Sequence, residues 1–266
     1  MSHDLVIRDG WVIDGTGTAA RRADVAIDGG LIVAVGEVDE RGRREIDAAD
    51  HVVTPGFIDG HTHMDAQVMW DPLGTCSVWH GVTSVVMGNC GFTLAPTRPT
   101  ERHLVLRSLE RAEDISAAAM QEALAWDWES FGDYLDAVDR APKGINYAAQ
   151  IGHSALRTWA LGEAAFERTA DADEVTRMED ELRRALDAGA IGFTTSQNAR
   201  HETADDRPVA SRQAGWDEVA RLVAVVGDAG GVFEVALDHA AQSPDPTVRR
   251  AYLDQFEELA IATGTP

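Results

Sequence analysis

The stretch PGFIDGHTHMD, residues 55–65, places His61 and His63 one residue apart at the end of a short apolar run. Since residues i and i+2 of a strand face the same side, the two imidazoles point at one place. Asp59 and Asp65 are close enough in the sequence to accept hydrogen bonds from the histidines. Converging imidazoles suit a metal such as zinc, so this stretch predicts one side of a metal site.

Beyond this stretch, strand patterns alternate with amphipathic helix patterns. The strands are predicted at 81–91, 144–153, 190–196 and 232–238, the helices at 171–189, 215–231 and 247–264, and further inserted helices within 98–140. Alternation of this kind predicts parallel strands joined by right-handed crossovers. The phosphate-binding glycine pattern of an open doubly wound sheet follows none of the strands. The predicted fold is therefore α/β, a (β/α)8 TIM-type barrel that is incomplete in this chain, with about five βα units.

The first 54 residues have a different pattern, with short β-rich runs and turn signals. Asp9-Gly10 and Asp28-Gly29 each predict a hairpin. A module of this size is too short to close a sandwich alone. We therefore predict an N-terminal β-sandwich portion at 1–54 and the N-terminal part of a barrel at 55–266.

Composition and charge exclude several classes of partner. The chain has 266 residues and a net charge of −22, which argues against binding nucleic acid or an anionic membrane. No apolar run approaches the roughly 20 residues of a membrane span. The first residues lack the features of a signal peptide, and two cysteines make no disulfide framework. We expect a cytoplasmic protein.

A second candidate feature is MGNCGF, residues 87–92, at the end of a buried strand. Gly88 and Gly91 flank Cys90 and allow a close approach of the backbone. If this strand neighbours the first strand of the barrel, a Cys90 thiolate can bind zinc beside the histidine pair. The alternative is a small buried thiol without function. Cys76, which is not framed by glycines on both sides and lies in a predicted helix, is expected to be of that kind.

Four segments resemble a known family: VTPGFIDGHTHMD, GVTSVVMGNCGFTLAPTRP, IGHSALR and ALDAGAIGFTTS. They resemble the amidohydrolase superfamily, and within it the D-aminoacylase or N-acyl-D-amino-acid deacylase branch. The resemblance implies a β-sandwich and a metal-bearing barrel that hydrolyses the amide of N-acylated D-amino acids. It also implies that His61 and His63 hold one zinc position and that Cys90 is a zinc ligand, with one or two Zn²⁺ ions bound.

The distribution of lysine supports a role for the thiolate. Many binuclear amidohydrolases bridge two metals with a carboxylated lysine on the fourth strand. The predicted fourth strand, 190–196, has no lysine, and Lys143, the one lysine among 23 basic residues, precedes the third strand. Cys90 is the available anion that can offset the metal charge in place of such a group.

The fifth strand departs from the family pattern. Its relatives place a zinc-binding histidine shortly after a Gly-Gly pair, and here Ala236 stands at that position, with Glu234 two residues earlier and His239 three residues later. A mononuclear and a binuclear site therefore both remain open. The family's next histidine and its catalytic aspartate align beyond residue 266, so we assign the general base to no residue.

Four further residues are predicted to bind an N-acyl amino acid substrate. His153 and Arg157 follow the third strand, where capping of the strand end is the alternative role. His201 and Arg212 belong to a long polar loop after the fourth strand. An arginine there can bind a substrate carboxylate, and exposed loop charges without function are the alternative.

The predicted activity is metal-dependent hydrolysis of linear amides. One alternative is a cyclic-amide hydrolase of the dihydroorotase or hydantoinase type. Another is an inactive or partial barrel that acts as a binding or assembly module. For partners, we expect the small-molecule substrate and either a homo-oligomer or a complementing C-terminal polypeptide.

Overall fold

The computed structural model of the chain describes residues 2–266, except for the side chains of residues 112 and 113. Its internal contacts separate two compact units that meet between Phe57 and Ile58. The boundary predicted from the sequence lies slightly earlier, between residues 54 and 55. Among the described residues, no helix has the length and apolar character needed to cross a bilayer.

The first unit is a five-stranded sheet in the order β3-β2-β1-β4, with β5 also paired to β1. Its strands are β1 (His3–Val12), β2 (Arg21–Asp28), β3 (Leu31–Gly36), β4 (Gly42–Asp47) and β5 (Val52–Val53). The hairpin predicted at Asp28-Gly29 is confirmed, because β2 and β3 pair antiparallel across this turn. That this sheet belongs to a sandwich stays a prediction.

The hairpin predicted at Asp9-Gly10 is wrong. Both residues lie inside β1, where the pairing register with β2 shifts between Ile7 and Gly10. Asp9 has a φ of 59°, and its N–H donates to the Asp24 carboxylate on β2. A left-handed residue thus inserts a bulge into a continuous strand. Asp9 does adopt a turn-like backbone conformation. Because β1 pairs with β2 on both sides of it, the result is a bulge and not a hairpin.

The second unit contains two three-stranded sheets, β6-β7-β8 and β9-β10-β11. Their strands are β6 (Phe57–Asp59), β7 (Val82–Met87), β8 (Asn146–Ala149), β9 (Ile151–Gly152), β10 (Gly192–Ser196) and β11 (Val232–Ala236). Only Gln150 separates β8 from β9, so one path of chain joins the two sheets. The described pairs β7–β8, β9–β10 and β10–β11 are parallel. Neighbouring strands follow the chain order, as in part of a (β/α)8 barrel.

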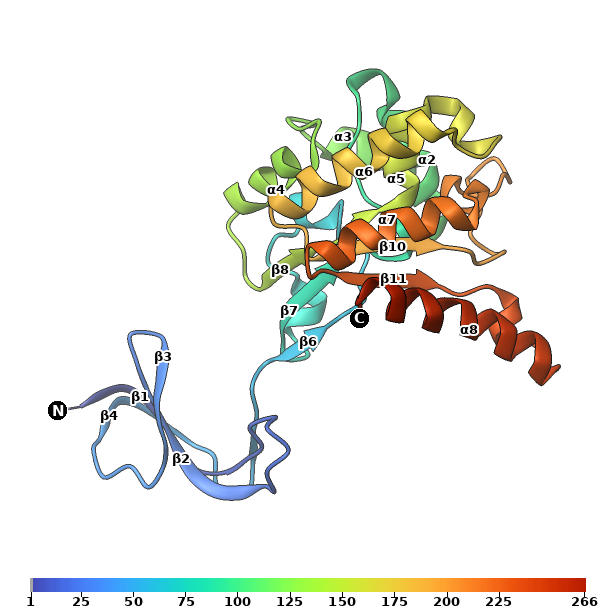
Figure 1. Cartoon of the computed structure of the whole chain (residues 1–266). Helices are drawn as coiled ribbons and strands as arrows, with labels where there is room; N and C mark the ends of the chain where they lie inside the picture. The colour runs from blue at the N-terminus through green and yellow to red at the C-terminus, as the bar shows by residue number, and fades with distance from the viewer. Residues whose placement is uncertain (1) are drawn as a thin grey trace. The chain divides into compact units, whose positions relative to one another are not determined.

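Eight α-helices connect and cover these strands (Figure 1). They are α1 (Thr75–Val78), α2 (Arg102–Glu113), α3 (Ala117–Ala123), α4 (Phe131–Arg140), α5 (His153–Leu161), α6 (Ala172–Asp187), α7 (Trp216–Asp228) and α8 (Pro246–Thr263). Six short 3₁₀ turns complete the set: η1 (Gln67–Met69), η2 (Asn89–Gly91), η3 (Pro99–Glu101), η4 (Gly162–Phe166), η5 (Ala210–Gln213) and η6 (His239–Gln242). The inserted helices predicted within 98–140 are confirmed as α2, α3 and α4. Helix α5 had no counterpart among the predicted elements.

Helix α6 shows why the helical pattern was readable from the sequence. Val175, Met178 and Leu182 recur on one face and are buried. At the start of the helix, Asp171 accepts a hydrogen bond from the Glu174 N–H, and Glu174 accepts one from the Asp171 N–H. This capping box satisfies two backbone donors that the helix itself leaves unpaired.

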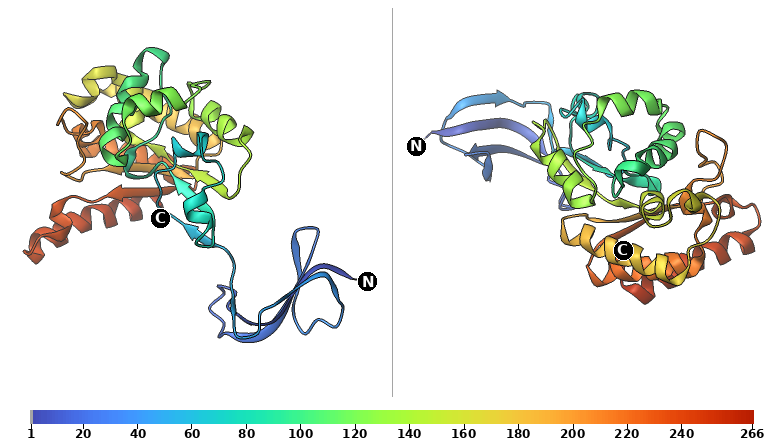
Figure 2. Two further views of the ribbon diagram at one scale, coloured as in Figure 1. Left: turned by 180° about the vertical axis from the view of Figure 1, so that it is seen from behind. Right: turned by 90° about the horizontal axis from the view of Figure 1, so that it is seen from above.

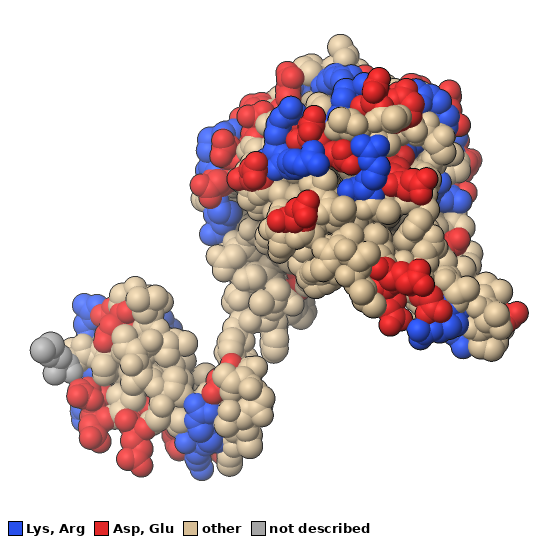
Figure 3. Space-filling view, in the orientation of Figure 1, with Lys and Arg blue, Asp and Glu red and all other residues tan. Residues whose placement is uncertain are grey.

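Helices α6, α7 and α8 follow one another alongside β10 and β11 in Figure 1. In Figure 2, α8 again runs beside β11, where Phe256 stacks on Phe233 with ring centroids 6.4 Å apart. The surface in Figure 3 carries acidic and basic side chains interspersed over these helices. The apolar core thus lies between the strands and the helices, and the strand ends remain free to carry a site.

Candidate metal centre

His61 and His63 lie in the loop that follows β6, on either side of an anchored threonine. The Thr62 N–H and hydroxyl both donate to the Val86 carbonyl of β7, at 2.9 and 2.8 Å. With Thr62 fixed, its two neighbours project to the opposite side, as the i, i+2 pattern predicts. The imidazole centroids are 5.3 Å apart and the rings are nearly perpendicular.

Cys90 lies in η2, directly after β7, in an unusual backbone conformation. Its φ is 55°, and Gly88 and Gly91 on either side have φ of 86° and 81°. A left-handed conformation costs a non-glycine residue of this kind about 1–3 kcal/mol and persists only where the surroundings impose it. The Gly91 N–H donates to the Thr194 hydroxyl of β10, at 2.9 Å, which fixes one end of the turn.

A buried asparagine fixes the other end of this turn. The Asn89 amide donates to the carbonyls of Thr62 and Val86, and its oxygen accepts a hydrogen bond from Gln150. Asn89 therefore joins the loop of the histidine pair to the turn that carries Cys90. The two loops are held together before any metal is considered.

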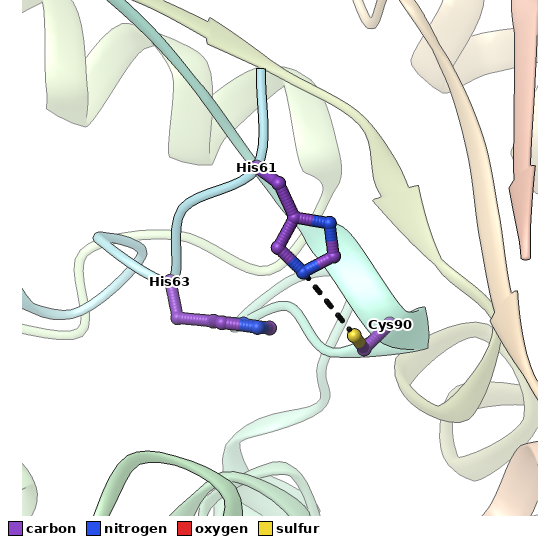
Figure 4. Close-up of side chains that lie close together, drawn as sticks. All are labelled: His61, His63 and Cys90. Atoms are coloured by element: carbon purple, nitrogen blue, oxygen red, sulfur yellow. Dashed lines mark hydrogen bonds between the residues drawn. The ribbon is translucent and has the colours of Figure 1, made fainter. Parts of the chain in front are cut away.

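The three predicted ligands meet in this structure (Figure 4). His61 Nε2 is 3.4 Å from Cys90 Sγ, and one donor atom from each of His61, His63 and Cys90 lies within 4.8 Å of the other two. Donor atoms roughly 2.0–2.3 Å from a tetrahedral zinc lie roughly 3.3–3.7 Å apart, so small side-chain movements suffice. Two imidazoles and a thiol are also a donor set that zinc prefers. The residues present therefore fit the metal.

The electrostatics of His63 also suit a ligand. Burial, the nearby His61 ring and the nearby His201 ring lower the pKa of His63 to about 4. The imidazole is therefore neutral at pH 7, and a metal ligand must carry a free lone pair.

Asp65 lies behind the Cys90 turn and is fully buried. Its Oδ2 accepts a hydrogen bond from the Gly88 N–H at 3.1 Å, and Oδ1 has no hydrogen-bond partner among the described residues. Burial raises the pKa of this carboxyl to about 7. The other predicted acceptor, Asp59, accepts from the His61 backbone N–H at 3.2 Å.

Sequence reasoning gave no role to Glu234, which the structure places beside the ligands. Its Oε1 is 3.3 Å from His61 Nδ1, and its Oε2 accepts a hydrogen bond from Gln150 Nε2 at 3.2 Å. The sequence contains one indication of a role, because an acidic residue in an otherwise apolar strand such as β11 needs a hydrogen-bonding or charged partner. Ala236, two residues later on the same side of β11, offers no donor atom.

His153 and Arg157 are away from this cluster, in a buried network between α5 and α7. Both side chains are fully buried against Glu218, with N···O distances of 2.8 Å from His153 and 2.5 Å from Arg157. His153 Nδ1 also contacts the Thr195 hydroxyl at 2.8 Å. Since a carboxylate only accepts, His153 Nε2 carries the proton and Nδ1 accepts from Thr195. These contacts leave neither side chain facing the metal ligands, so the structure does not support their predicted substrate role.

His201 and Arg212 have different positions in the loop after β10. His201 contacts the Ser196 hydroxyl at 2.6 Å and packs against Phe92, with centroids 5.3 Å apart. Arg212 instead donates to the carbonyls of Ala199 and His201, both at 3.2 Å, and thereby shapes the loop. His201 is thus close to the cluster, and Arg212 acts on the backbone.

A cavity of about 200 Å³ adjoins the cluster. It is lined by His63, Phe92, Arg111, Arg200, His201 and Glu202. Arg111 is already paired with Glu202 and Asp206, whereas Arg200 presents an exposed guanidinium to this cavity. A larger cavity of about 400 Å³ lies around α2 and includes none of the predicted ligands.

Comparison with known proteins agrees with the family resemblance seen in the sequence. The sequence pattern of the amidohydrolase family matches residues 44–249. N-acyl-D-glutamate deacylase of Alcaligenes xylosoxydans xylosoxydans is 37% identical over 247 residues, which are 88% of this chain and 46% of that protein.

Two solved structures are similar over nearly the whole chain. A crystal structure of D-aminoacylase has a TM-score of 0.78 at 31% identity, covering 99% of this chain and 50% of that one. N-acyl-D-glutamate deacylase from Bordetella bronchiseptica, complexed with zinc and a phosphonate inhibitor, has a TM-score of 0.77 at 29% identity, covering 100% and 50%. The chain thus spans half or less of each of these relatives, and the predicted partial barrel is confirmed.

The first prediction concerns the turn that carries Cys90. In Gly88→Ala, the new Cβ would lie 2.0 Å from the Gln150 carbonyl oxygen at a positive φ, so the turn must shift. We expect a loss of at least about 1–3 kcal/mol in the free energy of unfolding. Urea unfolding measures it, with Gly60→Ala, whose Cβ would meet nothing within 4 Å, as the matched control. Equal stability of the two variants would contradict the close approach.

The second prediction concerns the network of Glu218. Glu218→Gln leaves Arg157 buried without its counter-charge, and breaking a buried ion pair on one side costs about 3–5 kcal/mol. Urea unfolding of the full chain should show a loss of this size. Glu257→Gln removes an exposed partner of Arg250 and should leave the unfolding midpoint unchanged. A midpoint for Glu218→Gln equal to that of this control would show that the network contributes nothing.

The third prediction is that acid removes the stability contributed by the Glu218 network. Burial opposes the ionised form of Glu218, but His153 and Arg157 lower its pKa from 4.5 to about 2. Burial lowers the pKa of His153 below 6.5. In both cases the unfolded chain binds more protons as pH falls, so stability present above these ordinary values is lost in acid. The free energy of unfolding of the unmodified chain minus that of Glu218→Gln should therefore shrink as the pH falls from 7 toward 3. The raised pKa of Asp65 opposes this trend in either protein alone but cancels in the difference, and a constant difference would contradict the assignment.

Proposed function

The chain belongs to the amidohydrolase family, and on that basis we propose that it takes part in zinc-dependent hydrolysis of the amide bond of N-acyl-D-amino acids. The observation that carries the proposal is the meeting of two imidazoles and a thiol at the ends of β6 and β7. Deacylases at 29–37% identity among the relatives support the substrate class. The predicted cytoplasmic location and the predicted partner polypeptide or homo-oligomer stay predictions.

His61, His63 and Cys90 would hold the metal. When bound, zinc supplies a Lewis acid for the amide carbonyl and lowers the pKa of a bound water from 15.7 to about 7. The half-buried His63, whose lowered pKa keeps it neutral at pH 7, offers a lone pair, and the His61 ring supplies a second imidazole nitrogen. Cys90 would supply the negative charge, and the proximity of its Sγ to a donor atom of each histidine, within 4.8 Å, supports a shared metal.

The absence of a lysine from β10 favours the thiolate as the anionic ligand. This strand reads GFTTS and is buried along its whole length. A carboxylated lysine, as in cyclic-amide hydrolases of the hydantoinase type, has no place on it. We therefore prefer the interpretation of the chain as part of a deacylase over that of a cyclic-amide hydrolase.

The cavity beside His63 is the proposed position of the substrate. Its volume of about 200 Å³ suits part of a small acylated amino acid. Arg200 is the proposed partner of the substrate carboxylate, since a guanidinium binds a carboxylate through two parallel hydrogen bonds. His201 and Phe92 form the wall next to it. Arg212 supports this wall from behind by holding the loop carbonyls.

The fourth prediction tests the metal site. Cys90→Ala removes the anionic ligand, so we expect at least a tenfold loss of zinc content on dialysis. Metal analysis of the purified full chain gives this result. Cys76→Ala, which alters an exposed thiol on α1, is the matched control. Absence of bound metal in the unmodified chain, or unchanged zinc in Cys90→Ala, would contradict the proposal.

A further inference from the structure

We propose that Glu234 is a positioning residue for the metal centre, which holds the His61 ring so that Nε2 faces the metal. The inference rests on the proposed metal site and adds a residue outside its ligand set. Glu234 comes from β11, far in sequence from both ligand loops. It stands two residues before Ala236, the position near the end of β11 that offers no metal ligand.

The two nitrogens of His61 have different neighbours. Nε2 is 3.4 Å from Cys90 Sγ, on the side of the other ligands, and Nδ1 is 3.3 Å from Glu234 Oε1. A carboxylate can only accept a hydrogen bond, so it favours the tautomer with the proton on Nδ1. In a neutral ring, that tautomer leaves the lone pair on Nε2, where the metal would bind. Glu234 thus selects both the tautomer and the ring orientation.

The need for such a partner follows from the exposure of His61. Its side chain is 52% exposed, whereas that of Glu234 is 24% exposed. An exposed imidazole turns freely between rotamers, and ordering it costs free energy when the metal binds. A carboxylate on Nδ1 restrains the ring in advance. In metal sites in general, such outer partners contribute about 10–100-fold to affinity.

Glu234 also contacts the groups that hold the second ligand loop. Its Oε1 is 3.5 Å from the Cys90 N–H, and Oε2 accepts from Gln150 Nε2 at 3.2 Å. The same Gln150 amide donates to Asn89, which is bonded to the histidine loop. One carboxylate therefore touches both ligand loops and the junction between β8 and β9. Its loss should loosen the whole arrangement without removing a ligand.

The position of Glu234 in the sheet explains its reach. Glu234 pairs with Thr194 and Ala236 with Ser196 in the parallel register of β10 and β11. Residues two apart share a face, so Ala236 occupies the strand end above Glu234. Because alanine is short, it leaves room for the longer Glu234 side chain to extend toward the His61 ring. A bulky residue at 236 would fill this path.

The fifth prediction is tested by metal affinity rather than by activity alone. The dissociation constant for Zn²⁺ is measured on the full chain by competition with a chromophoric chelator. Glu234→Ala is expected to weaken zinc binding about 10–100-fold, and the isosteric Glu234→Gln by a smaller factor, since its amide oxygen can take the same place beside Nδ1. Glu258→Gln, on the exposed side of α8, is the matched control and should bind as the unmodified chain does.

Cobalt substitution separates positioning from ligation. The absorption band from thiolate to Co²⁺ should persist in both Glu234 variants, because Cys90 remains a ligand, and disappear in Cys90→Ala. Circular dichroism establishes that each variant is folded. If the unmodified chain fails to bind Zn²⁺ or Co²⁺, both the proposed metal site and this inference are overturned. If the unmodified chain binds and both Glu234 variants bind equally well, only the inference is overturned.

A second readout addresses the tautomer directly. In a ¹⁵N-histidine NMR spectrum of the chain with ¹¹³Cd²⁺, the metal should couple to Nε2 of His61 and the proton should reside on Nδ1. In Glu234→Gln the same ring should show a mixture of tautomers in the metal-free protein. Coupling of the metal to Nδ1 of His61, or direct bonding of Cd²⁺ to Glu234 in place of His61, would overturn the assignment.

Discussion

The candidate metal site depends on one steric constraint, the close approach of the turn at residues 88–91 to the neighbouring strands. A Cβ on Gly88 would lie 2.0 Å from the Gln150 carbonyl oxygen, and one on Gly152 would lie 2.6 Å from the Gly91 carbonyl oxygen. One glycine in the turn and one on β9 thus allow the backbones to touch. Only at this separation does Cys90, in its left-handed conformation, reach the rings of the histidine loop.

Hydrogen bonds of buried polar side chains fix the geometry of this close approach. Thr62, Asn89 and Gln150 are hydrogen-bonded across three consecutive strands, and each is at least mostly buried. Because an unpaired buried polar group costs about 1–3 kcal/mol, these bonds penalise any alternative arrangement of the loops. The ligand loops are therefore preorganised by the protein, so metal binding need not order them.

Charge is distributed in two separate layers. On the helix side of β10, Glu218 neutralises Arg157 and orients the neutral His153, which fixes α5 and α7 to the sheet. At the strand ends, the Cys90 sulfur and the Glu234 carboxylate lie beside the His61 ring. The first group stabilises the fold because its charges are mutually satisfied. The second leaves ligand atoms directed at a common point, which suits a cation.

The sequence by itself determined the alternation of strands and helices and the candidate ligand set, since both are encoded by local spacing. A histidine pair at i and i+2 and a cysteine between glycines are local patterns. They can therefore be recognised in the sequence without knowing how the strands pair. Tertiary structure decided which distant groups surround them. His153 begins a helix and turns into the core rather than toward the cavity, and Glu234 becomes the neighbour of His61. Neither outcome is local, because side-chain partners that lie 65 or more residues apart in the sequence are brought together only by how the strands pair and the helices pack.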